Sequence, residues 1–280
     1  MSFSDVNSYY NTVKFTTNVI NSTLNNFLNW IQWRYDGKDS LLDIGTGPGN
    51  SLKEVIYPRL PSNFTKLVCS DISPGMVELQ KTEFQGYPKV SCEILDISAD
   101  ISDDLAEKFG TYDHVTSFAC LMWVSDQQKA MDNIFKLLKP GGDAFLVIVT
   151  DSPILQCLTP ICEDPRWKDY FKWWQDFYVF PYINLQKANA EAKGLKFMKT
   201  AGFVELKYET LTLPLIFHSD AEKESFLRSM PNMFSKHATP GEEEEIFQTR
   251  LRTLNNLLGS STASDSSSSW LMLYGKKPAF

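Results

Sequence analysis

Residues 40–50 read SLLDIGTGPGN, a short apolar run that ends in three glycines at alternate positions. The apolar run predicts a buried strand, and SLKEVIYPRL (51–60), which follows it, predicts a helix. Glycines at such a junction let the backbone turn sharply and approach a ligand closely. The segment therefore predicts a strand, a glycine loop and a helix, the arrangement that α/β proteins use to bind ligands at the carboxyl end of a strand.

Strand and helix patterns alternate from this segment to about residue 150. The other expected strands are 66–71, 90–96, 112–118, 143–149, 203–213 and 270–276, and the expected helices between the early ones are 74–84, 103–109 and 127–139. Alternation of this kind predicts an α/β fold with a doubly wound, mostly parallel sheet. With the strand of residues 40–45, seven strands are expected.

The 280 residues are expected to form a single domain, because one large core accommodates this length. Four parts are predicted: an N-terminal helical cap (1–36), a half that contains the glycine loop (40–150), an aromatic lid insertion (151–200), and closing strands and helices (201–280).

Composition argues against several functional classes. The formal charge of −7 disfavours a nucleic-acid partner, because such proteins carry a basic excess. No basic head with an apolar run opens the chain, and no window approaches the length of a membrane span. The five cysteines are scattered, so reduced thiols and a cytoplasmic location are expected. No obligate protein partner is implied.

Three acids follow or precede the predicted strand ends, where ligands of such sheets bind. Asp43 lies two residues before the first glycine of the loop, and its charge suits an ammonium or sulfonium ligand. Asp71 ends the second strand, where a carboxylate accepts from two ribose hydroxyls, and Asp96, after the third, is placed to accept from an adenine amino group. Alone, Asp71 also fits a helix N-cap and Asp96 a turn aspartate. Together with the loop they favour a nucleoside ligand.

The ordered motifs LLDIGTGPGN, CSDISPGM, EILDI, YDHVTSF and LLKPGGDAFLV resemble those of class I S-adenosylmethionine-dependent methyltransferases, which have a Rossmann-like fold. The resemblance covers residues 40–150 and implies S-adenosylmethionine as cofactor, S-adenosylhomocysteine as product and no metal. It implies that the loop glycines hold the methionine part, Asp71 the ribose, Asp96 and Ile97 the adenine, and that Phe118 lies near the sulfur. The full set of expected cofactor contacts is Asp43, Gly45, Thr46, Gly47, Gly49, Asn50, Asp71, Ile72, Asp96, Ile97 and Phe118.

Residues 28–148 further resemble insect juvenile hormone acid O-methyltransferases, which esterify a terpenoid carboxylic acid. Those enzymes carry a Leu-His-Trp step after the fourth strand and an N-terminal Gln, both thought to hold the acceptor carboxylate. Here the step reads Leu121-Met122-Trp123, and Lys14 is the nearest equivalent of the Gln. Met122 cannot donate a hydrogen bond. Drift with retained carboxylate binding is the alternative explanation.

The loss of these polar groups favours a phenolic hydroxyl as methyl acceptor over a terpenoid acid. A carboxylate is ionised at neutral pH and needs only orientation, whereas a phenol, with a pKa of about 10, must lose its proton. Lys14 and Tyr10 are the candidate catalytic residues, for acceptor orientation or deprotonation, although a solvated lysine and a packing tyrosine are the bland alternatives. Tyr9, Met122 and Trp123 are expected to contact the acceptor.

Residues 167–182, WKDYFKWWQDFYVFPY, contain nine aromatic residues in sixteen. Their helical spacing is also typical of a stripe that packs on the sheet. The functional interpretation is a lid in which Trp173, Phe177, Phe180 and Tyr182 cover a small apolar acceptor.

The sequence thus predicts a metal-independent O-methyltransferase that acts on a small apolar molecule, with a phenol favoured and a farnesoic-type acid as the alternative. A non-catalytic S-adenosylmethionine-binding protein and a nicotinamide-dependent dehydrogenase are the alternatives from other classes.

Overall fold

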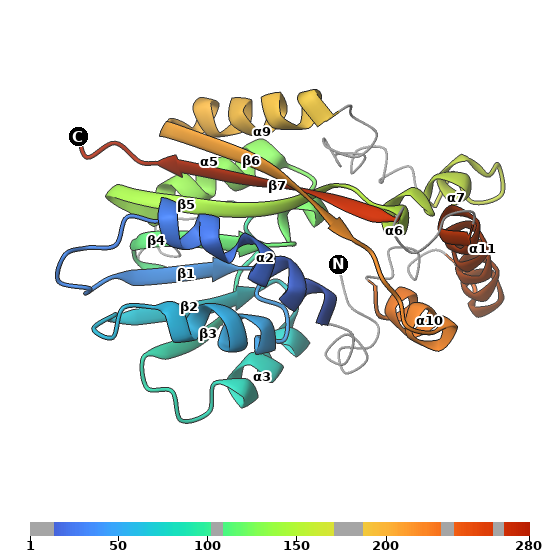
Figure 1. Cartoon of the computed structure of the whole chain (residues 1–280), viewed down its shortest axis with the longest axis horizontal. Helices are drawn as coiled ribbons and strands as arrows, with labels where there is room; N and C mark the ends of the chain where they lie inside the picture. Colours follow the sequence, from blue (N-terminus) through green and yellow to red (C-terminus); the bar gives the residue numbers. More distant parts are fainter. Residues whose placement is uncertain (1–13, 102–108, 171–186, 231–237, 260–265) are drawn as a thin grey trace.

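A computed structural model describes residues 14–101, 109–170, 187–230, 238–259 and 266–280. A seven-stranded sheet in the order β3-β2-β1-β4-β5-β7-β6 runs through the molecule (Figure 1). The strands are β1 (Ser40–Ile44), β2 (Lys66–Asp71), β3 (Val90–Ile94), β4 (Tyr112–Phe118), β5 (Leu138–Asp151), β6 (Val204–Pro214) and β7 (Ser267–Lys276). Neighbours from β3 to β5 are parallel, and β7 is antiparallel to both β5 and β6. The predicted doubly wound, mostly parallel sheet of seven strands is confirmed.

The order of strands explains the placement of the helices. Crossovers between parallel strands are right-handed. The connections β1–β2 and β2–β3 step across the sheet in one direction, and the connection β4–β5 steps in the other. The helices of these two groups therefore lie on opposite faces of the sheet. The first group comprises η1 (Leu52–Ile56), η2 (Tyr57–Arg59) and α3 (Pro74–Glu83), and the second is α5 (Gln127–Leu137). The N-terminal helix α2 (Lys14–Trp30) packs on η1, where Thr17 and Ser51 share a hydrogen bond of 2.7 Å.

Two predicted elements were wrong in detail. Residues 51–60 do not form one regular helix: a π-helical turn, closed by the Tyr57 N–H on the Leu52 carbonyl, is followed by a 3₁₀ turn. Pro58 has no N–H, so it cannot continue a helix in this stretch. β5 starts at Leu138, five residues before the expected position, because Pro140-Gly141-Gly142 lies inside the strand and does not close the preceding helix. At Gly142 a Cβ would lie 2.7 Å from the Asp113 carbonyl oxygen, so only glycine fits this close approach to β4. The expected helix 103–109 lies largely outside the described residues.

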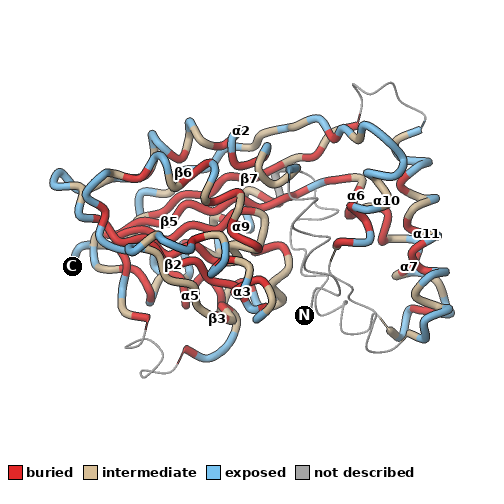
Figure 2. Tube along the Cα trace, turned by 90° about the horizontal axis from the view of Figure 1, so that it is seen from below, coloured by how far each residue is buried: buried red, intermediate tan, exposed pale blue. Residues whose placement is uncertain are grey.

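Helices from the expected lid region and from the closing part of the chain form a group at the carboxyl end of β5 (Figure 1). The group comprises α6 (Pro153–Gln156), α7 (Thr159–Glu163), α10 (Asp220–Ser229) and α11 (Pro240–Gly259). Its own small core, with Phe226, Phe247 and Leu254, is separate from the core of the sheet. The helix α9 (Lys187–Ala201), from the expected lid region, packs beside α5, where Gln128 donates to the Phe197 carbonyl at 3.3 Å. The inner strands of the sheet are mostly buried, whereas the edge strands β3 and β6 have no fully buried residue (Figure 2).

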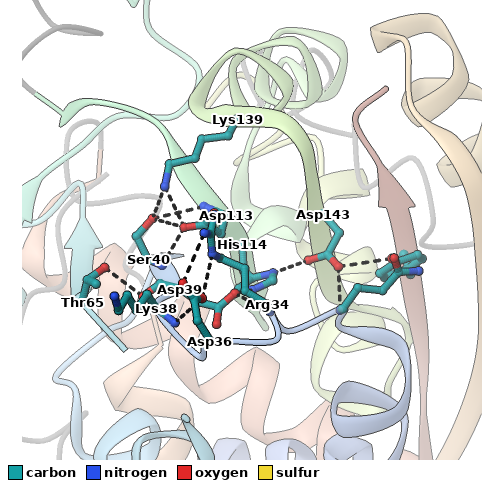
Figure 3. Close-up of polar contacts among 12 residues, drawn as sticks. Arg34, Asp36, Lys38, Asp39, Ser40, Thr65, Asp113, His114, Lys139 and Asp143 are labelled. Atoms are coloured by element: carbon teal, nitrogen blue, oxygen red, sulfur yellow. Dashed lines mark hydrogen bonds and ion pairs between the residues drawn. The ribbon is translucent and has the colours of Figure 1, made fainter. Parts of the chain in front are cut away.

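A buried histidine joins three segments near the amino ends of β1 and β4 (Figure 3). His114 lies 2.6 Å from a carboxylate oxygen of Asp143 through Nδ1 and 2.9 Å from one of Asp39 through Nε2. Asp143 also accepts from the backbone N–H of Gln32, and Asp39 from that of Arg34, so the segment after α2 is attached to the sheet. Burial opposes the charged imidazole, but the hydrogen bonds to Asp143 and Asp39 outweigh it and raise the pKa of His114 to about 9.

Replacing His114 by Gln is expected to lower the free energy of unfolding at pH 7 by on the order of 3 kcal/mol, because two buried carboxylates lose their cation. A raised pKa contributes stability that is complete below the ordinary value of 6.5 and is lost as pH rises through about 9. Urea unfolding at pH 7, 8.5 and 10 should therefore show a decline in the wild type that the variant lacks. His218→Gln, at an exposed position, is the matched control. Equal pH profiles for wild type and His114→Gln would contradict this assignment.

Candidate functional site

The glycine loop leaves β1 with a backbone that only glycine adopts without strain. Gly45, Gly47 and Gly49 have φ angles of 69°, 62° and 95°, in the left-handed region. A Cβ at Gly45 would lie 2.0 Å from the Cys120 sulfur, so space as well as conformation requires glycine there. The Thr46 N–H donates to the Ser70 carbonyl, which attaches the loop to β2.

Asp43 lies buried under this loop, with 2% of its surface exposed. Its two carboxylate oxygens accept from the hydroxyls of Thr116 on β4, at 2.6 Å, and Thr46 in the loop, at 2.8 Å. Burial raises the pKa of Asp43 to about 7; the two hydroxyls lower it and the Asp71 carboxylate raises it further. A cationic group beside Asp43 would relieve the cost of burying this carboxylate.

Asp71 ends β2 and holds the loop from the other side. Its Oδ2 accepts from the Gly47 N–H at 3.0 Å and its Oδ1 from the Ser73 N–H at 2.9 Å. Burial raises the pKa of Asp71, and the backbone N–H groups partly offset this. A carboxylate has about four acceptor positions, so capacity remains for a ligand hydroxyl.

The other expected cofactor residues lie around the same strand ends. Ile72 is an exposed apolar side chain next to Asp71, and Ile97 is buried. Asp96 accepts from the N–H and the hydroxyl of Ser98. The Asn50 side-chain oxygen is buried and has no hydrogen-bond partner among the residues that the structure describes, so it has capacity to accept from a ligand.

A cavity of about 30 Å³ opens between the loop and helix α2. Asp43, the loop from Gly45 to Pro48, and Phe118 line one side, and Thr16 and Ile20 of α2 line the other. Its size fits a small group such as an ammonium, and Asp71, Ile72 and Asp96 lie outside its lining. The buried Asp43 carboxylate and the glycine conformations fit the methionine end of the implied cofactor, whereas Gly49 and Asn50 lie outside the cavity lining.

A second cavity, of about 310 Å³, lies on the neighbouring side of α2. Its walls combine three phenylalanine rings with the polar groups of Lys14, Asn18, His218 and Glu222; the rings are Phe15, Phe217 and Phe226. Lys14 is exposed at the start of α2 and has no carboxylate partner among the described residues. An ammonium within an apolar wall of this size suits a small molecule with one anionic end.

The expected acceptor contacts are only partly described. Met122 is buried in the sheet core and Trp123 is half-buried; neither lines the two cavities above. Tyr9, Tyr10, Trp173, Phe177, Phe180 and Tyr182 lie outside the described residues, so their roles stay predictions. In the described ranges no group of three or more His, Cys, Asp or Glu side chains is placed to hold a metal. None of the described helices is both long and apolar enough to cross a membrane.

Several residues of the site were not predicted from the sequence; Pro48, Ser51, Leu52 and Ala119 line the first cavity beside the expected ones. Thr116 and Cys120 contact Asp43 and Gly45 from β4 and the segment after it, and Thr16 and Ile20 of α2 close the first cavity. The apolar spacing of α2 predicted a helix and did not show which of its sides faces the loop. The alternation of residues along β4 would have placed Thr116 and Phe118 on the same side of the sheet.

Comparison with known proteins places these features in context. A model described as a methyltransferase domain matches residues 42–144. The chain is 36% identical over 151 residues to juvenile hormone acid O-methyltransferase of Drosophila melanogaster. The matched segment covers 53% of this chain and 50% of that protein. The chain is 31% identical over 189 residues to the protein of the same name from Bombyx mori, with coverages of 68% and 65%. The matches therefore span half to two thirds of these relatives.

A solved structure shares the fold at low sequence identity. The phosphoethanolamine N-methyltransferase 2 of Haemonchus contortus, in complex with S-adenosyl-L-methionine, superposes with a TM-score of 0.51. Identity is 16%, and the superposition covers 92% of this chain and 52% of that one.

Replacing Gly45 by Ala is expected to lower the free energy of unfolding by more than the strain of its positive φ angle, because the added Cβ also meets the Cys120 sulfur. Gly86 is the matched control, because its φ of 84° is similar and no atom lies within 4 Å of an added Cβ. Gly86→Ala should cost about 1 kcal/mol. Gly45→Ala should cost at least about 2 kcal/mol more, because the Cys120 sulfur must move. Chemical unfolding measures both, and equal losses would show that the loop has room at Gly45.

Replacing Asp43 by Asn is expected to stabilise the chain at pH 8. The raised pKa means that this group's contribution to stability is present below the ordinary value of 3.8 and is lost as pH rises through about 7. Asn cannot ionise, so the gain approaches about 4 kcal/mol at most. Thermal unfolding at pH 5 and pH 8 should show a gap between variant and wild type that widens with pH. A gap independent of pH would contradict the buried carboxylate.

Proposed function

We propose that the chain is a class I S-adenosylmethionine-dependent methyltransferase that transfers a methyl group to an oxygen of a small apolar acceptor, with a carboxylate as the acceptor group. The single observation that carries the proposal is the buried Asp43 carboxylate beneath the left-handed glycine loop, next to a cavity that admits a cationic group. The cofactor, when bound, supplies an electrophilic methyl group on a sulfonium centre.

The residues around the loop would hold that cofactor in an extended arrangement. Asp43 provides negative charge at the methionine end, and the Gly45–Gly49 backbone allows close approach. The remaining acceptor positions of Asp71 suit two ribose hydroxyls, and Ile72, Ile97 and Asp96 suit the adenine. Phe118 lines the cavity between these groups and α2, where the sulfur is expected.

The second cavity supports a carboxylate as acceptor. Lys14 is a cation in the lining of this cavity, beside phenylalanine rings and the Glu222 carboxylate, and a charged donor binds a carboxylate more strongly than a neutral group. A carboxylate is ionised at neutral pH, so orientation in line with the methyl group is what the chain must supply. The two relatives named juvenile hormone acid O-methyltransferase support the same acceptor class.

A phenolic hydroxyl, which the sequence analysis favoured, is the second candidate. Met122 stands where the resembling enzymes have a histidine, so one neutral donor is missing. A phenol would need the Lys14 ammonium nearby to lower its pKa, or Lys14 itself as a base after desolvation. The apolar phenylalanine walls accommodate either acceptor.

The test is transfer of labelled methyl from S-adenosylmethionine to a panel of farnesoic-type acids and substituted phenols. We expect ester formation with the acids. Lys14→Gln should raise KM for an acid about 10- to 100-fold and change kcat little, because the ammonium orients ground state and transition state alike. Lys38→Gln, at an exposed position that lines neither cavity, is the matched control.

Each contrary outcome identifies an alternative. Methyl ethers formed exclusively from phenols would replace the acid by a phenol. Adenosylhomocysteine binding without turnover on any acceptor would indicate a binding protein, and binding of a nicotinamide dinucleotide in its place would indicate a dehydrogenase.

A further inference from the structure

Two cysteines stand opposite each other on neighbouring strands at the edge of the sheet. Cys69 of β2 and Cys92 of β3 are direct partners in the parallel register. Register partners project to the same face, and neighbouring strands lie about 4.8 Å apart. That spacing is within the Cα separation of about 4.4–6.8 Å that a disulfide bridges. No sequence pattern indicates this pair, because 22 residues lie between the two cysteines and no CxxC motif is present.

The two thiols differ in exposure and in their surroundings. Cys69 is fully buried, whereas Cys92 is half-buried on the edge strand β3. A hydrogen bond from the Cys69 thiol lowers the pKa of Cys92, and the nearby Lys81 ammonium on α3 adds to this. Burial and the carboxylates of Glu93 and Glu78, the latter paired with Lys81, oppose the shift without reversing it. Burial raises the pKa of Cys69. Reactive cysteines typically occupy partly exposed positions near positive charge, so Cys92 is the nucleophile of the pair and Cys69 its neighbour thiol.

The remaining cysteines lack this combination. Burial raises the pKa of Cys120, Cys157 and Cys162, the last to about 12. These three thiols are therefore protonated at neutral pH and weakly nucleophilic. Only the pair on β2 and β3 brings together an activated sulfur and a second thiol in register among the described cysteines.

We propose that Cys92 and Cys69 form a peroxide-reactive dithiol, in which Cys92 is oxidised first and Cys69 closes a disulfide. The Cys92 thiolate sulfur attacks one oxygen of hydrogen peroxide, the O–O bond breaks, and hydroxide leaves, which gives a sulfenic acid on Cys92. The Cys69 sulfur then attacks the Cys92 sulfur and the S–O bond breaks. The departing hydroxide takes the Cys69 proton and leaves as water. The pair loses two electrons, and the peroxide is reduced to hydroxide and water. This reaction does not depend on whether the chain transfers methyl groups.

The test treats the full, reduced chain with hydrogen peroxide at pH 7 and maps its peptides without reduction. We expect one cross-linked pair of peptides that contains Cys69 and Cys92, with loss of two hydrogens, and its disappearance after dithiothreitol. In Cys69→Ser the sulfenic acid on Cys92 should persist and be trapped by dimedone. Cys162→Ser is the matched control and should retain the cross-link.

Alkylation kinetics provide a second readout that does not rely on a disulfide. Iodoacetamide should label Cys92 about tenfold or more faster than Cys162, because its thiolate is more populated at neutral pH. Circular dichroism checks that each variant is folded, and Cys69→Ala replaces Cys69→Ser where the latter does not fold. Dimedone labelling of Cys120, Cys157 or Cys162 in place of Cys92 would overturn the proposal. So would a wild-type chain that shows no Cys69–Cys92 cross-link under conditions that oxidise free glutathione.

Discussion

A carboxylate buried among hydroxyls, with no cation beside it in the described part of the chain, is the constraint around which the site is organised. Asp43 stays in the core because Thr116 and Thr46 donate to it, and Thr46 can do so only because the loop folds back over β1 through left-handed glycines. The same arrangement leaves Asp43 with a pKa near neutrality. The fold thus buries the Asp43 carboxylate at a cost in free energy that a cationic ligand beside it would reduce.

At the amino ends of the strands, opposite to Asp43, buried carboxylates are neutralised by a residue of the chain itself. There Asp39 and Asp143 are also buried, but His114 lies between them as an imidazolium and pairs with both. The amino ends of the strands therefore neutralise Asp39 and Asp143 with His114, and this attaches the N-terminal segment to the sheet. The carboxyl ends leave Asp43 available to a ligand, and it is at the carboxyl ends that parallel sheets of this kind bind ligands.

The sequence predicted the sheet and the acids because both depend on local patterns. Alternating apolar runs and amphipathic helices define a parallel sheet, and its strand ends place Asp43 and Asp71 at one edge. Pro140-Gly141-Gly142 predicted the end of a helix, but it lies inside β5. Such residues end helices and also permit close contact between strands, as Gly142 does against Asp113. The cavity at Lys14 could not be foreseen, because Phe217 and Phe226 come to it from about two hundred residues away.

Helix α2 is the common wall of the two cavities: Thr16 and Ile20 face the loop, and Phe15 and Asn18 face the larger chamber. A wall one helix thick cannot move toward one side without opening the other. Any ligand that shifts α2 therefore changes the affinity of the second cavity, and thermodynamic linkage requires the effect to be equal in both directions. Occupancy of one cavity would then be coupled to occupancy of the other, with a sign set by the direction in which the helix moves.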